Sequence, residues 1–205
     1  VHTRIMAYDD PEYMKVQNDG IMAIPDGGPL SSLGRKKGFD NMRRTTGPSY
    51  MEEIFKISVQ KGYRHFFYGS TEETLKKMRS KLIEEYPGLQ IAGLYSPPFR
   101  NLTEQEEKEI INMINENAPD FVWVGLGAPK QEKWIYENIG KYDAKVSVCA
   151  GATVDFLAGN VKRAPRWMSE HGLEWFYRFL QEPKRMFKRY FIDDVKIIKL
   201  IKKYR

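Results

Sequence analysis

Apolar and polar residues alternate along the middle of the chain with two different periods. Apolar residues at helical spacing predict helices over 48–62, 70–86, 103–117 and 130–138. Short apolar runs between them predict strands over 65–69, 89–94, 121–125 and 145–149. Strands and helices that alternate in this way form βαβ units. We therefore expect an α/β fold with a Rossmann-like, mainly parallel sheet flanked by helices.

The two ends of the chain differ from this middle part. A turn-rich stretch precedes Pro48, and beyond Gly159-Asn160 the composition becomes basic and aromatic. Residues 1–159 hold 20 Lys and Arg against 22 Asp and Glu, whereas residues 160–205 hold 13 against 5. The net charge of +6 therefore belongs to the C-terminal segment. We expect a Rossmann-like core over 1–159 and a basic helical appendage over 160–205.

The composition is that of a globular protein, with 41% hydrophobic and 29% charged residues. A single cysteine, Cys149, excludes an intramolecular disulfide and favours a reducing compartment. Because Cys149 lies in an apolar run, we expect a buried structural thiol. The sequence has no apolar run of about 18 residues and no signal-peptide pattern at Val1, so neither a membrane span nor secretion is expected.

A glycine-rich turn follows the strand predicted over 121–125. It carries Gly127 and leads into the helix that begins near Lys130. Glycines let backbone N–H groups approach a phosphate, and a helix N-terminus favours its charge. The turn is neither a complete dinucleotide fingerprint nor a P-loop, so a nucleotide site and a tight structural turn both remain open.

Two carboxylates occur among glycines. Asp26 follows an apolar stretch, where it is either a catalytic base at the end of a strand or the aspartate of an Asx turn. Asp155 lies at an expected strand-to-loop junction, where it either contacts a ribose or base or caps a turn. The residues alone leave both alternatives open.

Metal-ligand spacing is missing from the sequence. The histidines His2, His65 and His171 are isolated, and no Asp-x-Asp pair occurs. We expect no metal site and no cofactor.

The C-terminal segment interleaves basic and aromatic residues and is interrupted by Pro183. It predicts two or more short amphipathic helices, which suit an anionic membrane surface. The final stretch, 195–205, places lysines beside isoleucines and leucine. A core-packing helix with a solvated basic face is the alternative. RNA binding lacks a supporting signature, so we expect no nucleic-acid partner.

A series of motifs, in order along nearly the whole chain, gives the sequence a specific resemblance. These are Pro25-Asp26-Gly27, Gly47-Pro48, Tyr68-Gly69, Tyr86-Pro87-Gly88-Leu89, residues 125–132, residues 155–159, Arg163-Ala164-Pro165 and Gly172-Leu173-Glu174-Trp175. The series resembles the WecG/TagA/CpsF family, glycosyltransferase family 26. The Pro-Lys-Gln-Glu and Arg-Ala-Pro to Leu-Glu-Trp blocks carry most of its specificity.

The resemblance implies an inverting, metal-independent glycosyltransferase. The donor would be a UDP-sugar, and the acceptor an undecaprenyl-diphosphate-linked sugar such as N-acetylglucosamine. Relatives transfer N-acetylmannosamine, its uronic acid or glucose, for teichoic acid, enterobacterial common antigen, capsule or exopolysaccharide. The Ser-Pro-Pro-Phe-Arg loop at residues 96–100 favours a capsule or exopolysaccharide enzyme. We expect a cytoplasmic protein, peripheral on the inner face of the plasma membrane. The resemblance leaves the oligomeric state open, a monomer or a homo-oligomer, because relatives form dimers or trimers.

The resemblance also implies roles for particular residues. Asp26 matches the proposed catalytic base, and Arg44 a basic residue that helps to neutralise diphosphate charge. Gln131 and Asp155 match positions that line the donor pocket, and we assign Gly69 and Gly127 to substrate binding with them.

Further roles are expected outside the glycine-rich turns. Phe99, after the Ser-Pro-Pro loop, is expected to stack on uracil. Arg178, Arg185 and Arg189 match tail arginines that close over the site and meet the lipid diphosphate in the family.

Two features depart from the family pattern. The family's N-terminal strand ending in Thr-Asn is expected just before Val1 and is not among residues 1–205. Ser49 stands where many members of the family have aspartate. A catalytically inactive UDP-binding regulatory module is therefore kept as the alternative function.

Overall fold

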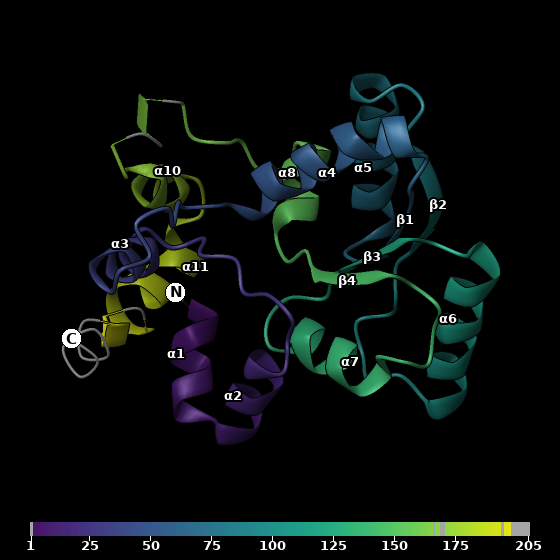
Figure 1. Cartoon of the computed structure of the whole chain (residues 1–205), viewed down its shortest axis with the longest axis horizontal. Helices are drawn as coiled ribbons and strands as arrows, with labels where there is room; N and C mark the ends of the chain where they lie inside the picture. Colours follow the sequence, from purple (N-terminus) through teal and green to yellow (C-terminus); the bar gives the residue numbers. More distant parts are fainter. Residues whose placement is uncertain (1, 166, 169–170, 194, 198–205) are drawn as a thin grey trace. The chain divides into compact units, whose positions relative to one another are not determined.

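The computed structural model describes residues 2–165, 167–168, 171–193 and 195–197 (Figure 1). The chain forms two compact units: residues 47–160, here called the sheet unit, and residues 1–46 with 161–205, here called the discontinuous unit. The expected division near 159 falls at one boundary of the sheet unit. Residues 1–46, which we had expected in the core, group instead with the C-terminal segment.

The sheet unit is built on four parallel strands. They are β1 (Arg64–Gly69), β2 (Gln90–Tyr95), β3 (Phe121–Gly125) and β4 (Val146–Cys149). Their order across the sheet is β2-β1-β3-β4, and every neighbouring pair is parallel. The predicted α/β fold with a parallel, Rossmann-like sheet is confirmed.

Five helices belong to this unit. They are α4 (Gly47–Lys61), α5 (Glu72–Glu85), α6 (Glu104–Asn117), α7 (Lys130–Asn138) and α8 (Thr153–Ala158). Helix α6 begins as predicted, because the Thr103 hydroxyl accepts from the backbone N–H of Glu106 and the Glu106 carboxylate accepts from that of Thr103. Helix α8 had not been predicted: at six residues it is too short to show a period.

The two faces of the sheet bury different sets of side chains, because successive strand residues point to opposite sides. On one face, Phe67 and Trp123 pack with residues of α4, α5 and α8. On the other face, Phe66, Tyr68 and Val122 pack with residues of α6 and α7. The layers appear in Figure 1, with α4, α5 and α8 on one side of the strands and α6 and α7 on the other.

The discontinuous unit consists of short helices from both ends of the chain. They are α1 (His2–Asp9), α2 (Pro11–Asn18), α3 (Gly28–Lys36), α10 (Glu174–Gln181), α11 (Pro183–Phe187) and the π-helical segment η1 (Lys188–Asp193). The short C-terminal helices are confirmed where described, and Pro183 opens α11 as a first-turn residue. The predicted stretch 195–205 lies mostly outside the described residues.

Candidate active site

The carboxyl ends of β1 and β3 mark the point where the chain reverses direction across the sheet. From β1 the chain moves outward to β2, then returns to place β3 on the other side of β1. In open parallel sheets, ligands bind beyond the carboxyl ends of the strands at such a switch point. Gly69 ends β1 and Gly125 ends β3, so these two residues mark the expected binding edge.

Gly69 lets the two strand ends approach closely. It has φ of +121°, and a Cβ at this position would lie 2.5 Å from the carbonyl carbon of Gly125. The next residue, Ser70, also has positive φ, and its N–H donates to the Gly125 carbonyl at 3.3 Å. The structure therefore gives Gly69 a packing role, and its assignment to substrate binding stays a prediction.

The loop with Phe99 is tied to this edge through Ser96. The Ser96 hydroxyl donates to the Ser70 carbonyl at 2.7 Å. Phe99 itself is 89% exposed, so its ring is free of protein packing as a stacking residue must be. Stacking on uracil stays a prediction.

The turn from β3 to α7 brings Gly127 and Gln131 to the same edge. Gly127 has φ of +79°, and a Cβ there would meet no atom within 4 Å. The buried Gln131 side chain reaches the loop after β4: its Oε1 accepts from the N–H of Gly151 at 3.1 Å. Gln131 thus joins the loops that follow β3 and β4, and Gly127 leaves open space beside them.

Asp155 lies in the first turn of α8, rather than at a strand-to-loop junction as expected. Its Oδ1 lies 3.4 Å from Nδ2 of Asn160, which also donates to the hydroxyl of the buried Thr74 on α5 at 3.0 Å. Asn160 therefore links Asp155 to α5, the helix that follows β1. Its role had not been recognised in the sequence, because a single asparagine after a glycine carries no specific signal.

The expectation of a buried thiol at Cys149 is wrong. Cys149, the last residue of β4, is exposed. Its sulfur nevertheless lies among enough neighbours that desolvation raises the pKa of the thiol to about 12, and the negative charge of Glu132 adds to the shift. The exposed side chain is accessible to reagents, and the Glu132 carboxylate lies close enough to this strand end for its charge to act on the thiol.

In the discontinuous unit, Asp26, Arg44 and Glu174 form a connected group. Nε of Arg44 donates to the Asp26 carbonyl at 2.6 Å, and one terminal nitrogen lies 3.6 Å from the Asp26 carboxylate. The other terminal nitrogen lies 2.9 Å from the Glu174 carboxylate, at the start of α10. The Asp26 side chain is 64% exposed, so it is accessible to a substrate. Glu174 had been noted only as part of a motif.

Asp26 does not follow a strand, as its interpretation as a base at a strand end had required. It lies in irregular chain just before α3, and its neighbour Pro25 accepts from the N–H of Thr45 at 3.2 Å. Asp26 pairs instead with Arg44, in a loop that these contacts hold.

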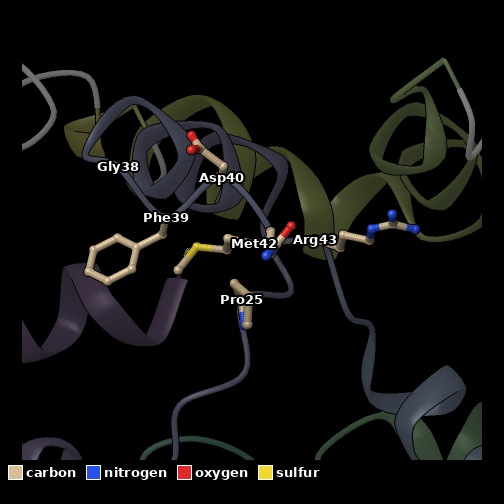
Figure 2. Close-up of a pocket in the computed structure, with 7 residues that line it drawn as sticks. Pro25, Gly38, Phe39, Asp40, Met42 and Arg43 are labelled. Carbon is tan, nitrogen blue, oxygen red and sulfur yellow. The ribbon is translucent and has the colours of Figure 1, made fainter.

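An open surface depression of about 510 Å³ is lined by Pro25, the residue before Asp26, and by residues 38–43. Figure 2 shows the side chains of Pro25, Phe39 and Met42 on one side of the loop, whereas Asp40 and Arg43 point away. Phe39 is 62% exposed. The depression therefore has an apolar wall formed by Pro25, Phe39 and Met42.

The expected tail arginines lie in three successive helical segments. Arg178 in α10 lies 3.8 Å from the Glu182 carboxylate. Arg189 lies in η1, and the side chain of Arg185, in α11, is outside the described residues. Exposed aromatic residues accompany them, including Trp175, Phe187 and Phe191. A membrane or lipid-diphosphate role for these residues stays a prediction.

Two features are missing from the described part of the chain. Within residues 2–165, 167–168, 171–193 and 195–197, no three His, Cys, Asp or Glu side chains are grouped as metal ligands would be. Over the same residues, no helix combines the length and apolar character that crossing a membrane requires.

Each unit thus holds some of the predicted site residues. The discontinuous unit joins Asp26 to Arg44, and the carboxyl edge of the sheet unit gathers the loops that carry Gly69, Gly127 and Gln131.

Comparison with known proteins confirms the family resemblance. The profile of the glycosyl transferase WecG/TagA/CpsF family matches residues 1–205. The chain belongs to this family of glycosyltransferases. It is 34% identical over 179 residues to the N-acetylglucosaminyldiphosphoundecaprenol N-acetyl-beta-D-mannosaminyltransferase of Bacillus subtilis strain 168, covering 87% of this chain and 68% of the relative.

Other relatives in the family carry the same name. The transferase of Bacillus spizizenii is 31% identical over 179 residues, again with 87% of this chain and 68% of the relative covered. The transferase of Staphylococcus aureus strain MW2 is 26% identical over 174 residues, covering 85% of this chain and 66% of the relative. This WecG/TagA/CpsF member is therefore an enzyme that transfers a sugar.

Proposed function

We propose that this enzyme transfers N-acetylmannosamine from UDP-N-acetylmannosamine to undecaprenyl-diphosphate-linked N-acetylglucosamine. The observation that carries the proposal is the 34% identity to the Bacillus subtilis transferase over 87% of this chain. The relatives' names favour N-acetylmannosamine over its uronic acid or glucose.

Asp26 is the general base of the proposed reaction. Its exposed carboxylate takes the proton of the acceptor hydroxyl as that oxygen attacks the anomeric carbon of the donor sugar. The new carbon–oxygen bond forms while the bond from the anomeric carbon to the diphosphate breaks, and UDP leaves. Attack opposite the leaving group inverts an α-linked donor to a β-linked product, the linkage in the names of the relatives.

Arg44 has two tasks in this proposal. Its bonds to the carbonyl and carboxylate of Asp26 orient the base, and its positive charge offsets the negative charge of a diphosphate. The Glu174 carboxylate pairs with the other terminal nitrogen of the guanidinium, so Arg44 is held between two carboxylates.

The UDP moiety is assigned to the carboxyl edge of the sheet. Gly127 provides open space where a helix N-terminus begins, and the buried Gln131 fixes the loops on either side. Catalysis without a metal is part of the proposal, with Arg44 as the charge-neutralising group.

The basic and aromatic tail is proposed to bring the enzyme to the anionic inner face of the plasma membrane, where its lipid acceptor lies. Exposed Trp175, Phe187 and Phe191 supply apolar contact, and the surrounding lysines and arginines supply charge.

The test measures UDP release from UDP-N-acetylmannosamine, UDP-N-acetylmannosaminuronic acid and UDP-glucose, with and without the lipid-linked acceptor. Release that requires both UDP-N-acetylmannosamine and the acceptor, and persists in EDTA, is the expected result. UDP binding without release for any donor would instead support the inactive regulatory module.

Asp26→Asn separates the mechanism from the family assignment. The variant keeps the size of the side chain but cannot accept the proton, so we expect turnover to fall by about 10³-fold with UDP affinity unchanged. Asp40→Asn, on the neighbouring loop, is the matched control and is expected to keep full activity. Wild-type turnover in Asp26→Asn would remove Asp26 from the reaction.

A further inference from the structure

One buried carboxylate oxygen at the carboxyl edge of the sheet has no partner among the described residues. It is Oε2 of Glu132, in the first turn of α7. The other oxygen of the same carboxylate, Oε1, accepts from Nε2 of Gln131 at 3.0 Å. One oxygen of this carboxylate is therefore anchored, and the other is buried without a hydrogen-bond donor from the described residues.

The anchored half is fixed by a short chain of hydrogen bonds. The N–H of Gly151 donates to Oε1 of Gln131, and Nε2 of the same amide donates to Glu132. The first link orients the Gln131 amide, since its oxygen must face Gly151 and its nitrogen must face Glu132. Gln131 is thus a positioning residue, and Glu132 is the group it positions.

The location of the carboxylate is that of a ligand site in this fold. Glu132 follows the Gly127 turn at the end of β3, and its charge reaches the Cys149 thiol at the end of β4. The turn itself leaves open space, because a Cβ on Gly127 would meet nothing within 4 Å. Ligands of parallel sheets bind at this edge.

The chemistry of the unpartnered oxygen, Oε2 of Glu132, limits what it can bind. A buried acceptor without a donor is costly, so such an atom calls for a partner that the protein does not supply. A carboxylate repels phosphate groups and accepts hydrogen bonds, and most of the neutral donors of a nucleotide sugar are hydroxyl groups, beside the N3–H of uracil and the N–H of an acetamido group. A ribose and a hexose both carry hydroxyl groups.

We propose that Oε2 of Glu132 accepts a hydrogen bond from a hydroxyl of the nucleotide-sugar donor, on the ribose or on the transferred sugar. This assigns Glu132 as a substrate-binding residue in addition to those predicted from the sequence. The inference rests on the proposed UDP-sugar donor.

The experiment measures the affinities of wild type and Glu132→Gln for UDP, 2′-deoxy-UDP, 3′-deoxy-UDP and UDP-N-acetylmannosamine by calorimetry. Glu132→Gln keeps the shape of the side chain and removes the charge. Glu137→Gln is the matched control, because Glu137 is exposed on the same helix. Thermal unfolding of all three proteins checks that the fold is retained.

For a ribose contact, wild type binds UDP about 10-fold more tightly than the analogue that lacks the contacted hydroxyl, as expected for a charged hydrogen bond. Glu132→Gln loses that discrimination and binds UDP about 10-fold more weakly, whereas Glu137→Gln behaves as wild type. For a contact with the transferred sugar, Glu132→Gln binds UDP normally and UDP-N-acetylmannosamine more weakly. Either pattern supports the proposal and tells the two sources apart.

The proposal is overturned if wild type binds UDP and UDP-N-acetylmannosamine and Glu132→Gln matches it on all four ligands. If Glu132→Gln does not fold, the affinities of the wild-type protein for the same four ligands still test the proposal. Wild type must discriminate against one deoxy analogue or bind the sugar nucleotide more tightly than UDP, and failure on both counts overturns the inference. Wild type that binds no uridine nucleotide would overturn the proposed donor itself.

Discussion

The sheet unit and the discontinuous unit bury apolar side chains to different extents. In the sheet unit, large side chains such as Phe67 and Trp123 are fully buried on one face of the sheet, and Phe66 and Tyr68 on the other. In the discontinuous unit, one apolar cluster consists of Ile5 and Ile197 with Leu30 beside them. Exposed ion pairs supplement it.

The candidate chemistry is divided in the same way. The sheet unit offers backbone turns and amides that a tightly packed core holds in fixed positions, which suits recognition of a nucleotide. The discontinuous unit offers charged, accessible side chains such as Asp26 and Arg44, which suit proton transfer and charge neutralisation. Packing stability and reactive charge are thus carried by different parts of one chain.

Among the variants that test this comparison, Gly69→Ala is expected to have the largest effect on stability. Gly69→Ala places a Cβ 2.5 Å from the Gly125 carbonyl carbon, at a φ of +121° that side chains rarely adopt. We expect a loss of about 3 kcal/mol or more in the free energy of unfolding, measured by urea titration.

Gly140→Ala provides the control for Gly69→Ala. Its φ of +83° is also positive, but a Cβ there meets nothing within 4 Å. We expect it to lose only about 1–2 kcal/mol, the cost of the left-handed backbone alone. Equal losses in the two variants would show that the close approach of β1 and β3 is unimportant.

A second test addresses the buried histidine of the sheet unit. His65 is completely buried, and its Nδ1 accepts from Nε1 of Trp123 at 2.9 Å. Burial lowers the pKa of His65 from 6.5 to about 4, although the charge of Asp120 opposes the shift. Because the folded state resists protonation, this contribution to stability is complete above pH 6.5 and is lost as the pH falls toward 4.

The expected loss from His65 between pH 7 and pH 5 is about 2 kcal/mol, measured as the free energy of unfolding in urea. His65→Gln retains an acceptor for the Trp123 N–H but does not titrate in this range. Its unfolding curve supplies the background from other groups, and a wild-type curve with the same pH dependence would contradict the assignment.

The sequence predicted the sheet unit far better than the discontinuous unit, and for a physical reason. Residues 121–125 and 130–138 were predicted with the bounds that the structure shows, because an apolar run and a helical period each report on a buried face. Helices α1 to α3 bury only one or two side chains each, so no apolar period marks a buried face in them.

The residues of the candidate site also differ in how well the sequence predicted them. Asp26 and Arg44 were found through the family motifs, and the structure pairs them. Glu174 joins them through a contact between distant parts of the chain, and the free oxygen of Glu132 depends on side-chain geometry. No local pattern in the sequence reports such contacts.

A third test removes one charge from the connected group of Asp26, Arg44 and Glu174. Glu174→Gln removes the negative charge that holds one side of Arg44, at a nitrogen-to-oxygen distance of 2.9 Å. We expect kcat to fall about 10-fold while the affinity for UDP is unchanged, since Arg44 is then less well oriented. Glu53→Gln, which breaks an exposed pair with Lys56 on α4, should leave kcat unchanged.

The smallest effect is expected at the exposed ion pair between Lys196 and Asp9, whose nitrogen and oxygen lie 2.6 Å apart. Both side chains are about half exposed, so solvent screens their attraction. A double-mutant cycle with Lys196→Ala and Asp9→Ala should give a coupling of about 0.5 kcal/mol at low salt and less at 1 M salt. A coupling above about 2 kcal/mol that survives salt would contradict the comparison, because this pair would then contribute as much as a buried contact of the sheet unit.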